Sequence, residues 1–389
     1  MRRAGSPVYL DNNATAPLDP RVLDEMLPYL KGEFGNPASA SHAYGWTAEA
    51  AVEVARERVA AAVGAAPEEV CFTSGATEAD NLALRGALFA GAHLLTCATE
   101  HEAVLQTART LEGYGVSLTV LPVDENGRVS PEKLRKSLRD DTALVSVMLA
   151  NNETGVVQDI ASLAAVAAER GVPFHTDAAQ ALGRIPLDAG TIGFSMMSLS
   201  AHKAGGPKGV GALVVRRMPG LLRLTPLLTG GGQENGLRGG TLNVPGIIGF
   251  GKAAEIAAQN LPEEVERLRS LKLRLLEALT DGLFGTGIEV LVNGDAGSTL
   301  PNTLSLRFGG LDAGKLLAGC PQVAASTGSA CASRDPEPSH VLAAMGLSEK
   351  EISSTVRLSL GRFTTEEDVD EAAEHLVQAA RKARQTNFR

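Results

Sequence analysis

Lys203 occupies an unusual place for a lysine. It lies in SLSAHKAGGPKG (residues 198–209), after a weakly apolar run and before a bend made by Gly205, Gly206 and Pro207. Burial at the end of an apolar strand lowers the pKa of a lysine amine, so the amine loses its proton more easily and becomes a usable nucleophile. An ion-paired or snorkelling lysine would fit the same stretch, so this feature alone leaves both interpretations open.

TSGATEADN (residues 73–81) follows a short apolar strand expected at 70–72. Small residues and hydroxyl groups at a strand-to-helix turn present backbone N–H groups and a helix N-terminus, which form a natural seat for a phosphate. An ordinary capping turn has a similar composition. The stretch therefore indicates a phosphate-binding site only in combination with other features of the sequence.

Two further polar residues follow apolar strands. His101 lies in TEHEAVL after a strand expected at 93–97, and it is either a ligand or a hydrogen-bonded structural residue. Asp177 closes the apolar strand in FHTDAAQ, and Gln180 comes three residues later. Burial of a carboxylate at a strand end costs free energy unless a cation lies beside it, so Asp177 is a candidate partner for a cationic ligand. A structural ion pair or a helix N-cap is the alternative interpretation of Asp177.

Together these features supply what pyridoxal 5′-phosphate (PLP) requires. The cofactor needs a phosphate cradle, a side chain against its ring face, a carboxylate for the pyridinium nitrogen and a lysine that forms a Schiff base. Asp177 and Lys203 are 26 residues apart (203 − 177), which places them on successive strands. The combination predicts a PLP site in which Lys203 binds the cofactor covalently.

The elements that must position these residues alternate between helix and strand over residues 47–215. A helix is expected at 47–63, where apolar residues recur at helical spacing. Strands are expected at 70–72, 93–97, 117–123, 143–150, 172–177, 194–200 and 210–215. This pattern predicts an α/β fold with a mostly parallel sheet covered on both faces, and such sheets bind ligands beyond the carboxyl ends of their strands.

The pattern changes after about residue 255. A helix at 263–281, strands at 289–293 and 303–308 and a last helix opening at TTEE (364–367) predict a smaller α+β domain. We therefore expect a large cofactor-binding domain over residues 15–255 and a small domain made of residues 1–14 and 256–389.

GFGKAA (residues 249–254) matches the dinucleotide-binding pattern GxGxxA. That pattern should follow a buried strand, and here Pro245 and Gly246 interrupt the approach. A helix beginning near Pro245 is expected instead.

The composition excludes several classes of protein. In 389 residues, 36 basic and 45 acidic side chains give a net charge of −9, which argues against a nucleic-acid or anionic-membrane surface. No apolar run reaches the ~18 residues that span a bilayer, and the first ten residues lack the apolar segment of a secretory signal. Four cysteines without a CxxC pair indicate reduced thiols in a cytoplasm, and seven scattered histidines indicate no metal site.

Eight segments, in this order along the chain, resemble those of cysteine desulfurases and the related selenocysteine lyases. They are TSGATEADN, TEHEAVL, ANNETGVVQDI, HTDAAQALG, SAHKAGGPKGVGAL, RGGT, STGSACAS and VRLSLGRFT. Those enzymes are PLP-dependent and have the class V aminotransferase fold, which is a fold-type-I transferase. The similarity runs from residues 8–17 to residues 357–370, which is nearly the whole chain.

The resemblance implies a set of binding residues for cofactor and substrate. They are Ala76, Thr77, His101, Asn152, Asp177, Gln180, Ser200, His202, Lys203, Thr241 and Arg357. Of these, Ala76, Thr77, Ser200 and His202 are expected to bind the phosphate. Thr241, in RGGT, is expected to reach the phosphate of a neighbouring subunit, so the active unit should be a homodimer.

The remaining residues of this set surround the ring and the substrate. The resemblance implies that His101 stacks on the pyridine ring, Asp177 pairs with its nitrogen and Gln180 approaches its phenolic oxygen. Asn152 and Arg357 are expected to hold the substrate carboxylate, with Asn152 also touching the cofactor. Lys203 and His101 are expected to move protons during the reaction.

Cys331 lies in STGSACAS (residues 326–333), where small residues describe an unhindered, mobile loop. A cysteine there is exposed and able to act as a thiolate, although on these residues alone it could be incidental. The resemblance implies that Cys331 takes sulfur from L-cysteine as a persulfide, leaving L-alanine, for an acceptor or scaffold protein such as one serving iron–sulfur cluster assembly. Cys71, Cys97 and Cys320 lie in apolar or strand contexts and are expected to be packing residues.

Two positions depart from the family pattern. Ala201 stands where glycine is usual before the histidine, and Glu102 stands where many desulfurases have lysine. An acidic residue there disfavours an approaching thiolate, which favours selenocysteine as substrate. Selenocysteine lyase therefore remains an alternative, as do an ordinary class V aminotransferase, which has no use for Cys331, and a non-enzymatic scaffold.

Overall fold

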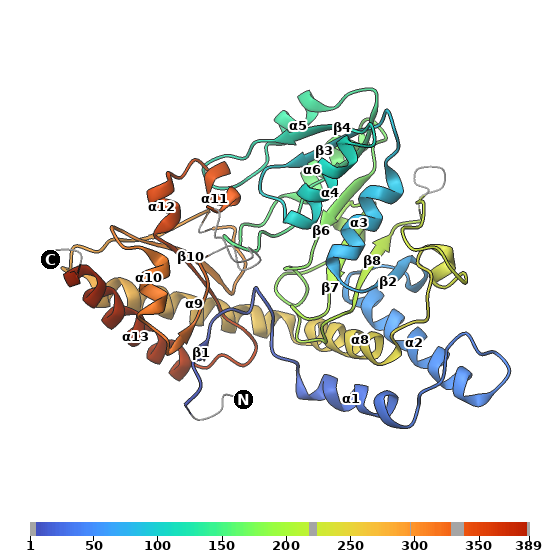
Figure 1. The fold of residues 1–389 in the computed structure, drawn as a ribbon, viewed down its shortest axis with the longest axis horizontal. Helices are drawn as coiled ribbons and strands as arrows, with labels where there is room; N and C mark the ends of the chain where they lie inside the picture. Colours follow the sequence, from blue (N-terminus) through green and yellow to red (C-terminus); the bar gives the residue numbers. More distant parts are fainter. Residues whose placement is uncertain (1–4, 218–223, 296, 328–337, 387–389) are drawn as a thin grey trace.

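The computed structural model describes residues 5–217, 224–295, 297–327 and 338–386. Within these ranges two bodies of secondary structure lie side by side, one built on residues 20–260 and the other on the C-terminal residues (Figure 1). No helix in the described residues is long and apolar enough to cross a membrane.

The first body is built on a sheet of seven described strands in the order β2-β8-β7-β6-β5-β3-β4. Their bounds are β2 Val70–Thr73, β3 His93–Cys97, β4 Ser117–Leu121, β5 Thr142–Ser146, β6 Phe174–Asp177, β7 Met196–Ser200 and β8 Gly211–Val215. Only β8 runs antiparallel to its neighbours. The predicted mostly parallel α/β sheet is therefore confirmed.

Helices cover both faces of this sheet, and the alternating side chains of each strand explain why. Leu95, Val145 and Met197 point into a core shared with α2 (Ala43–Ala62), α6 (Ile160–Ala168) and α8 (Val244–Gln259). Leu94, Leu144 and Met196, one residue earlier in each strand, point into a core shared with α3 (Ala76–Ala87) and α4 (Glu102–Glu112). Near-continuous apolar strands are what this two-sided burial requires.

Two helices test the sequence predictions at their ends. α2 begins at Ala43, four residues before the expected start, because the His42 ring accepts a hydrogen bond from the Gly45 N–H and caps the helix. α8 begins at Val244 with Asn243 as its cap. GFGKAA is therefore helical, as expected, and does not form a dinucleotide-binding turn.

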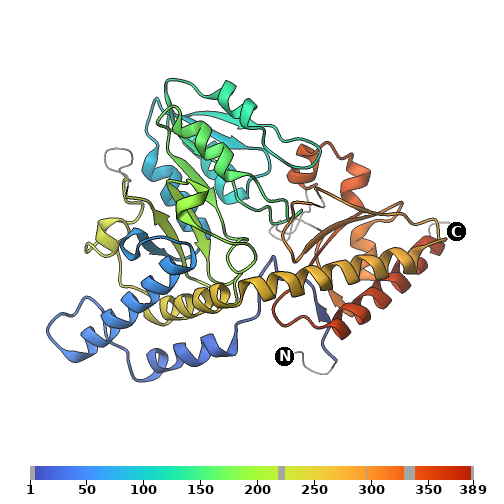
Figure 2. The ribbon, with the colours of Figure 1, turned by 180° about the vertical axis from the view of Figure 1, so that it is seen from behind.

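The second body is an antiparallel sheet of β9 (Val290–Val292), β10 (Thr303–Phe308) and β12 (Thr355–Ser359), packed against two long helices. These helices, α9 (Leu261–Leu283) and α13 (Glu366–Thr386), enclose a separate apolar core with the sheet. Figure 2 shows α8 and α9 following one another along one side of the molecule and connecting the two bodies. Residue 255, the expected boundary, lies inside α8, which continues to Gln259.

The remaining described elements are short or lie at the edges of the two bodies. They are β1 (Val8–Tyr9), β11 (Val323–Ala324), α1 (Pro20–Lys31), α5 (Pro131–Ser137), α7 (Ala189–Ile192), α10 (Ala313–Ala318), α11 (His340–Ala344), α12 (Glu349–Ser353), and the 3-10 turns η1 (Pro67–Glu69) and η2 (Glu234–Gly236). β1 pairs with β11 in parallel, so the N-terminal segment joins the second body before it crosses to the first.

Candidate active site

A cavity of about 800 Å3 opens where the carboxyl ends of the central strands face the second body. Its size is that of a small-molecule or cofactor site. Nine of the residues nominated from the sequence line it, namely Ala76, Thr77, His101, Asn152, Asp177, Ser200, His202, Lys203 and Arg357. The adjacent strands β6 and β7 bring Asp177 and the Lys203 turn together, since Asp177 pairs in register with Ser198.

Three nominated residues lie elsewhere. Gln180 is buried next to the cavity without lining it, and its side chain bonds to the carbonyl of Asn13, which does line it. Thr241 is exposed and does not reach the cavity of its own chain. Cys331 lies outside the described residues.

One end of the cavity is the N-terminus of α3. Gly75 occupies its N-cap position, and no side chain caps the first turn, so the amides of Ala76 and Thr77 have no partner from a capping side chain. A methyl group built on Gly75 would meet nothing, whereas one on Gly211 of β8 would lie 2.8 Å from the Gly75 Cα. Gly211 therefore lets this turn pack closely while its open side faces the cavity. Unpaired amides at a helix N-terminus suit an anion.

His202 stands beside this end of the cavity as a neutral ring. Its Nδ1 lies 3.1 Å from the Thr15 hydroxyl oxygen. Burial, followed by repulsion from Lys203, lowers the pKa of His202 to about 4. At neutral pH the ring can therefore donate one N–H to a phosphate without adding a charge.

His101 is held by the start of its own helix. It is the N-cap of α4, and its Nδ1 accepts a hydrogen bond from the Ala103 N–H at 3.1 Å. The neutral ring therefore carries its proton on Nε2. Burial lowers the pKa of His101 and the positive charge of Lys203 adds to this, although Asp177 opposes it. His101 is thus a neutral ring that carries its proton on Nε2.

Asp177 and Asp80 are two acids in this cavity with different roles. Asp177 accepts the Ala179 N–H at 2.8 Å and is 5% exposed. Asp80 is 1% exposed, its Oδ1 lies 3.6 Å from the His175 Nε2, and burial followed by the charge of Asp177 raises the pKa of Asp80 well above its usual range. Asp80 therefore favours its protonated, neutral form beside Asp177. Sequence reasoning missed Asp80, although it lies one helical turn after Ala76 on the same face of α3.

Arg357 projects from β12 of the second body and is 1% exposed. Its Nη2 lies 2.7 Å from the Asp11 carboxylate, and its Nη1 donates to the Asn152 carbonyl at 2.9 Å. The Asn13 side chain donates to the same carbonyl at 3.1 Å. The guanidinium is therefore fixed at the cavity wall, where its planar fork suits a carboxylate.

Sequence reasoning also missed one edge of the cavity. Ser339 donates to the buried Glu153 carboxylate at 2.6 Å, and His340 donates from Nε2 to the Glu100 carbonyl at 2.9 Å. The other ring nitrogen of His340 then faces the Glu102 carboxylate at 3.4 Å. Glu102, noted for its departure from the family pattern, is thus the partner of a histidine.

The described cysteines are packing residues, as predicted. Cys71, Cys97 and Cys320 are buried and form no disulfide. Burial raises the pKa of each thiol, that of Cys71 to about 12. No cluster of metal-ligating side chains occurs in the part of the chain that the structure describes.

The residues present fit PLP. An uncapped helix N-terminus with neutral His202 suits its phosphate, the buried Asp177 carboxylate suits a cationic ring nitrogen, and Lys203 supplies an amine in the same cavity. His101 adds a neutral ring, and Arg357 adds a fixed fork for an amino-acid carboxylate.

Three comparisons with known proteins give the same result. The model of the class V aminotransferase family matches residues 8–372. The chain is 50% identical to cysteine desulfurase IscS of Anaeromyxobacter sp. strain Fw109-5 over 384 residues, which cover 97% of this chain and 94% of that protein. A solved NifS-like protein has a TM-score of 0.87 at 37% identity, covering 96% of this chain and 98% of its own. The structure of SspA in complex with cysteine has a TM-score of 0.80 at 36% identity, with 92% and 99% covered.

Proposed function

Since the chain belongs to the class V aminotransferase family and is a cysteine desulfurase of that family, we propose that it uses PLP to convert L-cysteine to L-alanine and passes the sulfur to Cys331. The family depends on PLP, and one relative is known in complex with cysteine. The observation that carries the proposal is that Lys203, Asp177, His101 and Arg357 line one cavity of cofactor size.

Each end of the cavity has a different task in this reaction. The α3 N-terminus, Ser200 and His202 would hold the phosphate, and Asp177 would keep a proton on the ring nitrogen. His101 would cover the ring face, and Gln180 would donate to its phenolic oxygen. When bound, PLP supplies an electron sink that weakens the bonds at the substrate Cα.

The chain's own residues then orient the substrate and move protons. Arg357 binds the substrate carboxylate, with Asn152 beside it, which fixes the side chain that carries sulfur. The Lys203 amine takes the Cα proton, and the Nε2–H of His101 is available as an acid near the substrate sulfur. Both groups are half-buried in the cavity wall, which limits competition from water for these protons.

Sulfur transfer requires a thiolate, and the resemblance assigns it to Cys331. The Cys331 sulfur attacks the substrate sulfur, the Cβ–S bond breaks, and its electron pair returns to the carbon fragment, which is protonated and leaves as alanine. One cysteine and one enzyme thiol thus give one alanine and one persulfide, with no external oxidant or reductant. A protein acceptor would then take the persulfide sulfur.

The experiment follows alanine and the enzyme-bound persulfide in Cys331→Ala, with Cys320→Ala as the matched cysteine control. We expect Cys331→Ala to keep the cofactor absorbance and to lose alanine formation from cysteine by about 10³-fold or more. Undiminished alanine formation in that variant would contradict the role of Cys331. Equal or better turnover of selenocysteine would make the protein a lyase, and a requirement for an oxo acid would make it an aminotransferase.

We also propose a homodimer in which Thr241 completes the cavity of the partner subunit. Thr241 is exposed, and Arg238 in the same segment bonds to Glu78 of α3 at 2.9 Å. Phe34 and Tyr44 stack at 5.2 Å and remain 73% and 53% exposed, as a surface awaiting a second chain would be. Unpaired Cys71, Cys97 and Cys320 suit the reducing cytoplasm that we propose as its location.

A further inference from the structure

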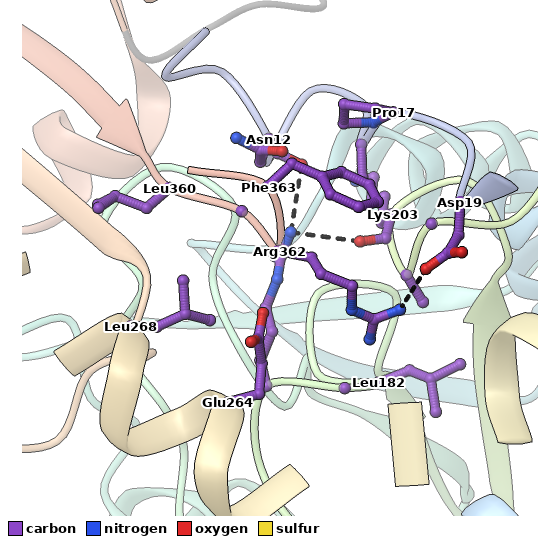
Figure 3. Close-up of a pocket in the computed structure, with 16 residues that line it drawn as sticks. Asn12, Pro17, Asp19, Leu182, Lys203, Glu264, Leu268, Leu360, Arg362 and Phe363 are labelled. Atoms are coloured by element: carbon purple, nitrogen blue, oxygen red, sulfur yellow. Dashed lines mark hydrogen bonds and ion pairs between the residues drawn. The ribbon is translucent and has the colours of Figure 1, made fainter. Parts of the chain in front are cut away.

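Arg184 is a buried arginine directly behind the cofactor cavity. It lies on the turn after β6 and is 6% exposed. Arg184 lines a second cavity, of about 40 Å3, which shares Lys203 with the main one. Figure 3 shows this cavity with Lys203, Asn12 and Asp19 labelled at its edge. This space holds little more than a water or two, so Arg184 does not face bulk solvent.

The guanidinium joins three segments of chain that build the main cavity. Its Nη1 donates to the side-chain oxygen of Gln180 and, at 3.3 Å, to the Gln180 carbonyl. Its Nη2 donates to the Asn12 carbonyl at 3.1 Å and, at a longer 3.4 Å, to the Lys203 carbonyl. The dashed lines that reach Asn12 and Lys203 in Figure 3 are these two bonds.

No carboxylate neutralises Arg184 within the described part of the chain. Two acids line the same small cavity, but Asp19 is held by Arg21 and Arg362, and Glu264 is held by Arg267. Burial, followed by repulsion from Arg357, lowers the pKa of Arg184 to about 9. The group therefore stays protonated at neutral pH as a buried cation whose partners are oxygen dipoles.

These contacts fix the orientation of the Gln180 amide. A guanidinium only donates hydrogen bonds, so the oxygen of the Gln180 side chain must face Arg184. The Nε2 group then faces the other way, where it donates one N–H to the Asn13 carbonyl at 3.0 Å. An amide nitrogen has two N–H groups, so one more remains for a ligand.

We propose that Arg184 is a positioning residue, which holds the Gln180 amide and the Lys203 backbone in place for PLP and acts through Gln180 on the phenolic oxygen. The inference rests on the proposed function, because it needs PLP in the main cavity. A cation on the far side of an amide polarises it and makes its N–H a stronger donor to an anionic oxygen. The Lys203 linkage, which shares its proton with that oxygen, then loses the proton at a lower pH.

The test is a pH titration of the visible absorbance of purified holoenzyme without cysteine. For Arg184→Met we expect the midpoint to rise by about 1 pH unit, because the Gln180 N–H becomes a weaker donor to the anionic oxygen. We also expect PLP to dissociate about tenfold more readily, as loss of a buried hydrogen bond allows. Arg362→Met is the matched control, since Arg362 lines the same small cavity but binds Asp19, and its midpoint should stay at the wild-type value.

The double variant tests the route through Gln180. In a Gln180→Leu background, adding Arg184→Met should move the midpoint by less than about 0.3 unit, because the relay is already gone. A midpoint shift of about 1 pH unit in that background would contradict an effect that passes through Gln180. A folded Arg184→Met protein with wild-type midpoint and PLP affinity would overturn the inference altogether.

A further variant covers the case in which Arg184→Met does not fold. Arg184→Lys keeps the charge, but a compact ammonium lacks the planar fork whose two nitrogens reach Gln180 on one side and Asn12 and Lys203 on the other, so PLP should dissociate several-fold more readily. Unchanged PLP affinity in that variant would count against positioning. A wild-type protein with no visible band after addition of PLP would instead contradict the proposed function.

Discussion

The cavity has two unlike sides, which we call the floor and the rim. The floor consists of His101, Asp177 and Lys203 at the ends of the central strands. The rim consists of Glu102, Ser339 and His340, where α4 meets the second body. Floor side chains are anchored within their own segment, as His101 is by Ala103 and Asp177 by Ala179. Rim side chains are anchored across the chain, since Ser339 binds Glu153, 186 residues away, and His340 binds Glu100, 240 residues away.

The acids of the two sides differ in exposure. Asp177 on the floor is 5% exposed, whereas the side chain of Glu102 on the rim is 46% exposed and that of its partner His340 is 36% exposed. Buried charges interact strongly and exposed ones weakly, because water screens the latter. We therefore assign the catalytic chemistry to the floor and only a small electrostatic effect to the rim. The predictions below test that division in descending order of effect.

Replacement of the floor amine should have the largest effect. Lys203→Ala should abolish the visible band and lower cysteine turnover by about 10⁴-fold, since both the covalent anchor and the proton carrier are lost. Lys252→Ala, which removes the surface partner of Glu255, is the control and should keep the band and the rate. The measurements are absorbance spectra and alanine release. A variant that keeps a tenth of the rate would place the chemistry elsewhere.

Glu100 should give an intermediate, pH-dependent effect. It lies directly before His101 and is 0% exposed, and burial raises its pKa to about 8. The folded state keeps a proton that the unfolded chain loses above its ordinary pKa, so the unfolding free energy falls as pH rises from about 5 to about 8. The Glu100→Gln variant does not lose unfolding free energy in this way. The difference in unfolding free energy between the variant and the wild type should therefore increase by about 3 kcal/mol, in favour of the variant, over that range.

The measurement for Glu100 is urea unfolding of the cofactor-free protein at pH 5 and pH 8. Glu112→Gln, at the exposed end of the helix that follows Glu100, should follow the wild type at both values. A constant difference between Glu100→Gln and wild type would mean that Glu100 is ionised in the folded protein.

The rim pair should give the smallest effect. A double-mutant cycle on Glu102→Gln and His340→Gln should yield a coupling of about 0.5 kcal/mol that shrinks in 1 M salt, because both side chains are partly in water. Melting temperatures at low and high salt measure it, and the separate Lys136–Glu132 pair on α5 provides a surface reference. A coupling free energy above about 2 kcal/mol that does not change in 1 M salt would mean that the rim pair interacts as strongly as buried charges do.

The same contrast explains what the sequence could predict. Floor residues follow apolar strands, so their place at one sheet edge follows from parallel topology, and the sequence places Asp177 and Lys203 at the ends of successive strands. Ser339 and His340 have no such local signal, because their partners are chosen by the packing of two bodies. Asp80 and Arg184 fall between these cases, since the sequence pattern gives the helix face or the turn on which they lie but not the groups that their side chains contact.

Errors at element ends have equally local causes. The α2 start was placed late because His42 replaces the usual serine, threonine or aspartate cap. The strand expected at 143–150 ends at Ser146, although backbone bonds from Val147 and Leu149 to β6 continue along the same edge. Apolar composition alone did not distinguish this irregular extension from regular strand.

The N-terminal segment carries a consequence for assembly during translation. Asp11 binds Arg357 and Asn12 binds the backbone of Ser359, across 346 and 347 residues. A ribosome therefore completes nearly the whole chain before the first dozen residues meet these partners. The N-terminal contacts of Arg357 and Ser359 beside the cavity therefore form only when synthesis is almost finished.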